Sequence, residues 1–492
     1  MPVPAAGVAA DPGPAWPVSR RQARRPDAGD ASAARAVHGS ILPGAGRAAH
    51  GGRILGDRFG PVPGDTGGGD ADAAGTTPLF LQDASRSVLT WARGRYLGLS
   101  SATGISVALA SCAAAWFSAG TAADMVRGVA ALWCGYLVLV AGRSVASKAA
   151  GTDTDHRLAS PVGWLAALGG SVGEAAVYAG LAVAAAAQRY PGTWPLAIGV
   201  VGLIAVRTVM TASSTPYGLV HPPQTLLGRA CAAAVTMAPG GRILVVGIVA
   251  PFWGARIVLL VLLAWAISTV GYGLAGRAVP AVAAVARGDG DGVAAPSASL
   301  VRLRDDGMLA RYLGGLVRGI LLPLPPAVLG LAAVTALAVI GLHGLPGLLV
   351  MAPAIVMVLA APGSANPHLG RFDWLVPVLL LSSQLLYIGA VGAGGRVPGP
   401  VVFALAAALL VRYTDLVCAQ RPVLLVKPRR PDSAPREYGT ELGWEGRLLF
   451  IGLAAGVGAA TAGYLALTAY LVLLLGVKVV RSCIIAPGED LA

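Results

Sequence analysis

Residues 161–187, PVGWLAALGGSVGEAAVYAGLAVAAAA, form an apolar run in which Glu174 is the one charged residue. A helix of that length can cross the hydrocarbon core of a bilayer, which takes about 20 predominantly apolar residues. The chain of 492 residues has the same character throughout, because 55% of its residues are hydrophobic and 12% are charged. Soluble domains carry about 25% charged residues. The composition therefore predicts an all-α protein, a polytopic helix bundle embedded in a membrane.

Further apolar runs of spanning length bring the prediction to about twelve transmembrane helices. We expect them at 99–119, 125–142, 161–187, 194–211, 241–253, 255–276, 318–341, 345–361, 372–391, 398–416, 447–461 and 463–480. The run at 241–253 is short, and joining 229–240 to it as one broken helix is an alternative. A polar break separates two sets of six, which predicts a membrane domain over 86–276, a cytoplasmic linker over 277–311 and a second membrane domain over 312–492.

The first 85 residues have a different composition. They are rich in Gly, Ala, Pro, Asp and Arg without helical or strand periodicity, as in GAGRAAHGGR at 44–53. Such a segment buries too little apolar area to offset its ordering entropy. We expect a disordered basic N-terminal tail over 1–85, followed by a short interfacial helix over Ser87–Leu97.

The distribution of Lys and Arg predicts the orientation, because cytoplasmic loops carry an excess of both. If the tail is cytoplasmic and the chain then crosses the membrane twelve times, only four arginines lie on the outer side of the membrane: Arg127, Arg189, Arg256 and Arg396. We expect a multi-pass protein of the cell (inner) membrane with both termini in the cytoplasm. This topology accounts for the net charge of +13, so we expect no nucleic-acid partner. The expected partners are membrane lipids, a second copy of the chain or another membrane protein.

Charge is costly within a membrane-spanning helix and usually faces protein or water, and five charged residues of the predicted helices are candidates for such positions. They are Glu174, Arg207, Asp373, Arg412 and Asp415. They are either structural ion pairs and interfacial residues, or the lining of a polar cavity that opens on the cytoplasmic face. The five cysteines, Cys112, Cys134, Cys231, Cys418 and Cys483, form no CxxC or His/Cys cluster. We expect them to pack as small apolar residues, with neither a disulfide framework nor a metal site.

The third apolar run carries a resemblance to a known family. Ser160-Pro-Val-Gly163-Trp-Leu165 and Val172-Gly-Glu174-Ala-Ala-Val177-Tyr178-Ala-Gly180-Leu resemble the corresponding helix of CDP-alcohol phosphatidyltransferases. The closest resemblance is to an actinobacterial membrane branch with an attached C-terminal domain of unknown function. Phe372-Asp373-Trp374-Leu375 and Gly443-Trp-Glu445-Gly446-Arg447 resemble short motifs of that domain. The resemblance implies a six-helix membrane domain and a role in phospholipid head-group synthesis.

The chemistry of that family depends on D-x-x-D-G-x-x-A-R followed by G-x-x-x-D-x-x-x-D, whose carboxylates bind divalent cations. In this chain the first pair of aspartate positions is occupied by Val138 and Ala141, or by Ser147 and Ala150. The second pair is occupied by Ala166 or Ala167 and by Gly170 or Ser171. Hard cations need clustered carboxylate oxygens, so we expect no catalytic metal pair and no cofactor. Asp153 and Asp155 could substitute only after a local rearrangement. Arg143 is the candidate contact for a lipid head group or phosphate.

Two further patterns concern the second half. Asp306-Gly-Met-Leu-Ala-Arg311 matches D-G-x-x-A-R, but its upstream partner position is Leu303 and no second aspartate motif follows, so we interpret it as chance. Gly163–Tyr178 and Gly370–Tyr387 share a Gly and a Tyr at similar places, and the next runs end in Val-Arg207 and Val-Arg412. These similarities make 312–492 a candidate degenerate repeat of the first domain.

The sequence thus supports two functional hypotheses. The first is a relative of the CDP-alcohol phosphatidyltransferases that lacks the metal-binding aspartates and is either non-catalytic or altered in chemistry. The second is a polytopic transporter with six helices on each side of a central loop, although its apolar runs are poor in polar residues.

Overall fold

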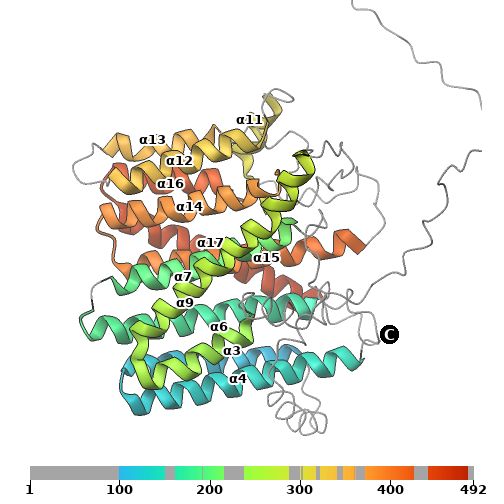
Figure 1. Cartoon of the computed structure of the whole chain (residues 1–492), viewed down its shortest axis with the longest axis vertical. Coiled ribbons are helices and arrows are strands. Elements are labelled where there is room, and N and C mark those ends of the chain that lie inside the picture. The colour runs from blue at the N-terminus through green and yellow to red at the C-terminus, as the bar shows by residue number, and fades with distance from the viewer. Residues whose placement is uncertain are drawn as a thin grey trace, which may run out of the picture. The chain divides into compact units, whose positions relative to one another are not determined.

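The computed structural model describes residues 99–149, 161–190, 192–214, 238–286, 300, 303–316, 322–340, 347–359, 361, 372–425 and 441–485, and this part of the chain contains helices but no strands (Figure 1). The helices before the polar break are α3 (Leu99–Ala119), α4 (Ala122–Ala149), α6 (Pro161–Ala187), α7 (Thr193–Ser214) and α9 (Pro239–Ala286). Those after it are α11 (Met308–Leu316), α12 (Leu324–Ile340), α13 (Gly347–Val358), α14 (Leu375–Gly394), α15 (Gly399–Leu425), α16 (Trp444–Gly456) and α17 (Ala460–Ile485). All of them belong to one unit, residues 65–492.

Eight helices in the described residues are long and apolar enough to cross a membrane: α3, α4, α6, α7, α9, α14, α15 and α17. The prediction of an all-α, multi-pass membrane protein is therefore confirmed. Helices α12 and α13 are apolar but shorter, and α16 has 13 residues. The predicted number of twelve spans stays a prediction.

The long helix α9 reverses its direction at Gly254. This glycine has φ 78° and ψ 171°, outside the helical region, and it divides α9 into two arms. A Cβ on Gly241 would lie 2.9 Å from the Trp265 ring, although a straight helix would separate these positions by about 36 Å. The arms are therefore antiparallel neighbours, and they correspond to the predicted runs at 241–253 and 255–276. The alternative segment 229–237 lies outside the described residues.

Small residues allow α3, α4 and α6 to approach closely. A Cβ on Gly180 of α6 would lie 2.8 Å from the Cα of Ala114 in α3, and a Cβ on Gly173 would lie 3.1 Å from the Cβ of Ala110. Lipid tails are as apolar as Leu side chains, so membrane helices associate through close packing of such small residues. This explains why the chain uses Gly and Ala where a soluble protein would use larger core residues.

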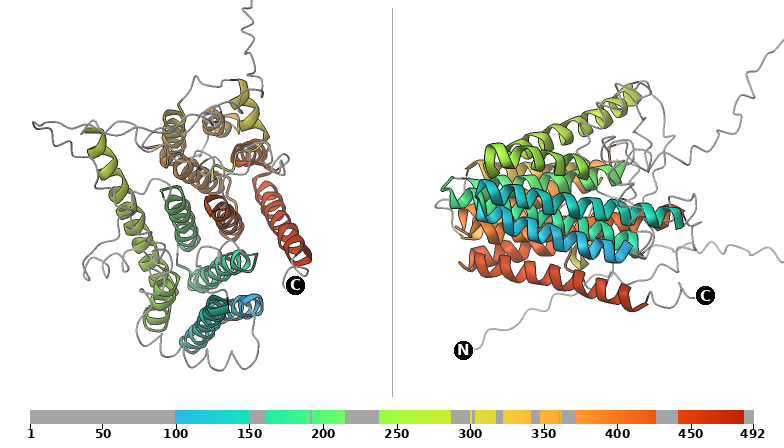
Figure 2. Two further views of the ribbon diagram at one scale, coloured as in Figure 1. Left: turned by 90° about the vertical axis from the view of Figure 1, so that its right-hand side faces the viewer. Right: turned by 90° about the horizontal axis from the view of Figure 1, so that it is seen from below.

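The two halves of the bundle meet along α7 and α15 (Figure 2). Helix α15 packs against both α6 and α7, and α7 also packs against α14. Most of the second half lies beyond this contact, with α12 and α13 packed together and α16 and α17 packed together. Helix α15 is therefore in a position to contribute side chains to sites on both sides of the contact.

Charged residues occur at both ends of the helices. Arg277 of α9 donates to Ser214 at the C-terminus of α7 at 2.6 Å, and Lys478 of α17 bonds Asp415 of α15. At the opposite end, Arg256 lies 4.8 Å over the Tyr190 ring. The cations that the orientation argument assigned to opposite faces thus occur at opposite ends.

Part of the predicted linker over 277–311 belongs to the packed structure. Helix α9 continues to Ala286, and α11 begins at Met308. Leu303, Arg304 and Asp305 are buried, so this polar stretch includes core residues. The predicted tail over 1–85 and the predicted interfacial helix over 87–97 lie outside the described residues.

Candidate functional site

A cavity of about 370 Å³ lies among α3, α4, α6, α7, α9 and α15. We call it the arginine cavity. Its polar lining comprises Ser106, Tyr136, Arg143, Ser171, Glu174, Tyr178, Thr208, Arg242, Thr414 and Cys418, and its apolar lining includes Leu139, Ile204, Ile243 and Val246. A volume in this range is typical of small-molecule sites, which combine an apolar lining with a few convergent polar groups.

The charge in the arginine cavity is predominantly positive. Arg242 forms an ion pair with Glu174 at 2.7 Å, and Glu174 also lies within electrostatic reach of Arg143 and Arg207. Among the residues that line the cavity, Glu174 is the only carboxylate. Two arginines, Arg143 and Arg242, therefore accompany one carboxylate among the described residues of the lining, and guanidinium groups attract an anion in a site of low dielectric constant.

The cavity also contains polar atoms that have no hydrogen-bond partner within the described structure. These are Tyr178 Oη and Arg242 Nε, both on residues that are less than one-tenth exposed. Buried donors are normally satisfied, and each exception calls for an explanation such as a bound molecule or ion. Both residues line the cavity, so a polar ligand there could satisfy these atoms.

Some of the positions at which the resemblance would place metal-binding carboxylates line this cavity, and none of them is a carboxylate. Ala167, Gly170 and Ser171 line it, and Ala141 is buried on α4. Within the described residues, no group of three or more His, Cys, Asp or Glu side chains could hold a metal ion. A single carboxylate from Glu174 is too few for a pair of hard cations, which take six or more oxygen ligands each. Asp153, Asp155 and the side chain of Ser147 lie outside the described residues.

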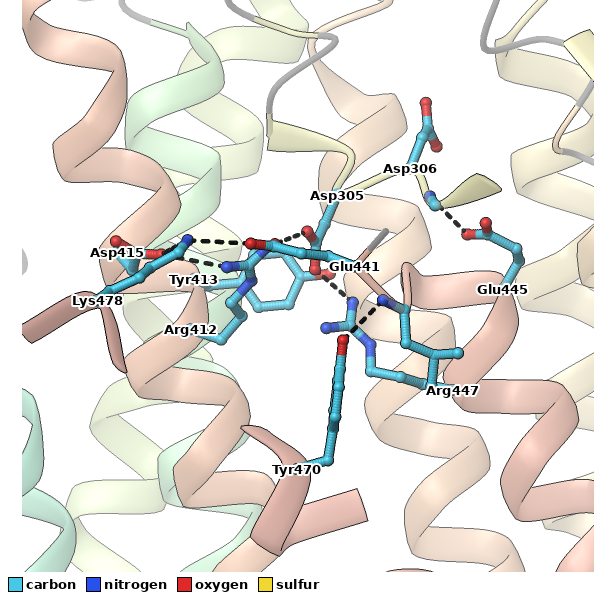
Figure 3. A network of polar contacts seen from close by, with 12 residues as sticks. Asp305, Asp306, Arg412, Tyr413, Asp415, Glu441, Glu445, Arg447, Tyr470 and Lys478 are labelled. Carbon is cyan, nitrogen blue, oxygen red and sulfur yellow. Dashed lines mark hydrogen bonds and ion pairs between the residues drawn. The ribbon is translucent and has the colours of Figure 1, made fainter. Parts of the chain in front are cut away.

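A second cluster of charges surrounds Asp305 (Figure 3). We call it the Asp305 network; its members are Asp305, Arg412, Asp415, Glu441, Arg447 and Lys478. Arg412 Nη2 donates to Asp305 Oδ1 at 2.8 Å, and Arg447 Nη2 donates to Asp305 Oδ2 at 2.6 Å. Arg412 also pairs with Asp415 and Glu441, which both pair with Lys478. The Asp305 carboxylate therefore lies between two guanidinium groups (Figure 3).

The pKa of Asp305 reflects this arrangement. Burial raises it, but the positive charges of Arg447 and Arg412 and their hydrogen bonds outweigh burial, so the pKa lies below its ordinary value. The carboxylate is therefore ionised at neutral pH. Asp305 also has φ 53°, in the left-handed region that non-glycine residues rarely adopt. A backbone conformation of this kind costs energy and persists only where its surroundings enforce it.

The segment after Asp305 docks on the start of α16. Glu445 accepts hydrogen bonds from the backbone N–H groups of Gly307 and Ala310, each at 3.2 Å, and Trp444 Nε1 donates to Asp306 Oδ1 at 2.8 Å. The D-G-x-x-A-R sequence at 306–311 therefore has a structural role, because it holds this segment against α16. Its match to the metal-binding motif of the family keeps its interpretation as chance.

The five charged residues singled out in the sequence fall in more than one place. Glu174 lines the arginine cavity, with Arg207 within electrostatic reach of it. Arg412 and Asp415 belong to the Asp305 network. Asp373 is buried just before α14. Arg143, the candidate phosphate contact, lines the arginine cavity.

Several functional candidates were missed in the sequence. Arg242, Asp305 and Glu441 were not among the candidate residues, and Arg447 was named only within a short motif. A signal for two of them exists: Gly241-Arg242-Ile-Leu and Gly446-Arg447-Leu-Leu are similar four-residue sequences, each within the first turns of a helix. Asp305 has no comparable signal, because its partners are 107 and 142 residues away along the chain.

Comparisons with protein-family models, with curated proteins and with solved structures gave no match to this chain.

Proposed function

We propose that the protein is a multi-pass membrane protein that binds the phosphate-bearing head group of a lipid in the arginine cavity, without metal-dependent catalysis. The observation that carries the proposal is the cavity itself: Arg143 and Arg242 line it, and it contains two buried polar atoms, Tyr178 Oη and Arg242 Nε, that have no partner within the described structure. Phosphate oxygens accept several hydrogen bonds at once and pair with Arg in a strong, charge-assisted geometry.

The shape of the lining favours a lipid over a free ion. Leu139, Ile243 and Val246 line the same cavity as Arg143 and Arg242, so a phosphate placed at the arginines would carry its glycerol or acyl carbons against apolar side chains. A small inorganic anion would leave this apolar part unfilled. The ligand class is therefore an amphiphile with a phosphate group.

The resemblance of the third helix to CDP-alcohol phosphatidyltransferases supports the same location. In that family the carboxylates that bind metal lie at positions occupied here by residues such as Ala167 and Gly170, both of which line the cavity. We therefore interpret the chain as a diverged relative that keeps a head-group site without the metals that activate an acceptor hydroxyl. In this proposal twelve helical segments, counting both arms of α9 and leaving out the nine-residue α11, cross the cell membrane with α11 on the cytoplasmic side.

Binding of dioctanoyl phosphatidic acid to the purified protein in detergent tests the proposal, with dioctanoylglycerol as the phosphate-free control. Arg242→Gln removes one charge-assisted contact worth about 1.5–3 kcal/mol, which corresponds to a loss of affinity of about 12- to 150-fold. Arg127→Gln, at an exposed arginine remote from the cavity, should leave affinity unchanged. Glu174→Gln removes the opposing charge and should tighten binding.

Equal affinities of Arg242→Gln and Arg127→Gln would place the ligand elsewhere. The same preparation, supplied with CDP-diacylglycerol, an alcohol and manganese, should form no phospholipid. Metal-dependent transfer that is lost in Asp153→Ala with Asp155→Ala would restore the enzymatic interpretation.

A further inference from the structure

The buried Asp305 carboxylate is held in the way that a protein holds an anionic ligand. It takes one guanidinium hydrogen bond on each oxygen, from Arg412 and from Arg447. Arg447 has no exposed surface, and within the described residues its Nε and Nη1 have no hydrogen-bond partner. Arg304 Nη1 is also buried and has no hydrogen-bond partner within the described residues. Arg304 lies outside the Asp305 network and pairs with Asp306 through Nε at 3.2 Å, whereas Arg447, a member of the network, has more donors than the Asp305 carboxylate satisfies.

The packing of the second half follows the packing of the first. Helices α3 and α4 pair, α6 packs on α3, and α9 packs on α4, α6 and α7. In the same order, α12 and α13 pair, α14 packs on α12, α16 packs on α13 and α14, and α17 packs on α15. The first arm of α9 corresponds to α16, because Gly247 of that arm faces Trp133 of α4, as α16 faces α13. The second arm corresponds to α17, because its Gly273 faces Met210 of α7, as α17 faces α15.

Local features occur at equivalent places in the two halves. Arg242 is the fourth residue of α9 and Arg447 is the fourth residue of α16, and each follows a glycine. Gly254 ends the first arm of α9 with φ 78°, and Gly458 lies between α16 and α17 with φ 76°. The sequence Arg-x-Pro-Gly occurs at 189–192 and at 396–399, before α7 and at the start of α15. Both arginines have positive φ, 60° and 52°.

We infer that the two halves are repeats that each contain one anion site, and that Asp305 supplies the anion of the second site from within the chain. Arg207 and Arg242 of the first half correspond to Arg412 and Arg447. Arg242 lines the arginine cavity, and Arg207 lies within electrostatic reach of Arg242. The second pair is bridged by Asp305. The assignment of the first site rests on the proposed function; the assignment of the second rests on the contacts of Asp305.

The consequence is a stoichiometry of one head group per chain. The second site has the arginines of an anion site, but a carboxylate already lies between them, and the segment that carries it is fastened to α16 through Glu445 and Trp444. If the carboxylate is removed, the same arginines should accept a small oxyanion such as acetate or phosphate. Acetate has the chemistry of the missing side chain, and phosphate has additional oxygens for the unsatisfied Arg447 donors.

Asp305→Gly tests the inference, because glycine accepts the positive φ of this position and leaves a space where the carboxylate was. The thermal midpoint of the purified full chain in detergent is measured against acetate, phosphate and chloride at equal ionic strength. We expect Asp305→Gly to unfold at a lower temperature than the unmodified chain, and acetate or phosphate, but not chloride, to restore the midpoint with saturation. Asp305→Asn fills the space with a neutral amide and should show no such recovery.

The outcomes separate this inference from the proposed function. Arg242→Gln combined with Asp305→Gly should leave the recovery intact, whereas Arg447→Gln combined with Asp305→Gly should abolish it. Recovery by chloride, or equal recovery in Asp305→Asn, would overturn the inference even if the arginine cavity binds phosphatidic acid. If Asp305→Gly yields no folded protein, solubilisation in acetate should yield folded protein. Asp305→Ala is a second variant for the same experiment. If acetate yields folded protein with neither variant, that result also counts against the inference.

Discussion

Replacement of Arg447 by Met should destabilise the fold strongly, although Arg447 lies outside the arginine cavity. Met keeps most of the length and volume of the Arg stem but removes the charge. Arg447 is fully buried, and its Nη2 lies 2.6 Å from Asp305 Oδ2. The variant therefore leaves Asp305 with one guanidinium partner in place of two.

The expected magnitude follows from the geometry. Two unit charges about 4 Å apart interact by about 4 kcal/mol at the effective dielectric constant of about 20 that suits protein sites. Removal of one partner from a buried ion pair costs about 3–5 kcal/mol. Arg412 remains 2.8 Å from Asp305 and compensates part of the loss, so we expect a decrease of about 3 kcal/mol in the free energy of unfolding.

Denaturant unfolding in mild detergent, followed by tryptophan fluorescence, measures this decrease. Arg127→Met is the matched control, because Arg127 pairs with Asp124 at 3.0 Å but its side chain is 60% exposed, and exposed pairs contribute about 1 kcal/mol or less. A double-mutant cycle with Asp305→Asn should give a coupling energy of about 1–3 kcal/mol.

The pH dependence provides a second check. The pKa of Asp305 in the folded protein lies below its ordinary value of 3.8, so the stabilisation is present above 3.8 and is lost as pH falls through the folded pKa. The penalty of Arg447→Met should stay constant from about pH 5 to 8 and shrink only under strongly acidic conditions. A penalty no larger than that of Arg127→Met, or a coupling energy near zero, would refute the assignment of Asp305 as a buried anion between two arginines.

Two other predictions concern packing and orientation. Gly180→Ala should destabilise the fold by about 1–3 kcal/mol, because its Cβ would lie 2.8 Å from the Cα of Ala114. Gly170→Ala on the same helix has open space around its Cβ and should be neutral or mildly stabilising in the same unfolding assay. Equal effects of the two variants would argue against close contact of α3 and α6. In a cysteine-free chain in intact cells, Gln188→Cys should react with an impermeant thiol reagent and Met308→Cys should not. Both residues are exposed and lie near opposite ends of the bundle. The reverse labelling pattern would invert the proposed topology.

The sequence by itself determined the class of the fold. Each helix is a local object whose backbone hydrogen bonds are internal, and lipid requires this of any spanning segment. The apolar run at 161–187 therefore predicted α6 at residues Pro161–Ala187 without information about its neighbours. The same reasoning identified the short run at 241–253 as a separate segment, which the structure shows as the first arm of α9. The cost of charge in lipid also singled out Glu174 and Arg412 as residues that need partners.

The identity of those partners was decided only by the tertiary structure. Glu174 pairs with Arg242, 68 residues further along the chain, and Asp305 lies in the stretch 277–311 whose polarity predicted a cytoplasmic linker. A buried charge is stabilised by whichever opposite charge the packing brings within a few ångströms, and a local pattern of apolar and polar residues contains no record of that neighbour. The reversal at Gly254 and the contact of α15 with both halves place these groups together, so the two anion sites are properties of the packed bundle.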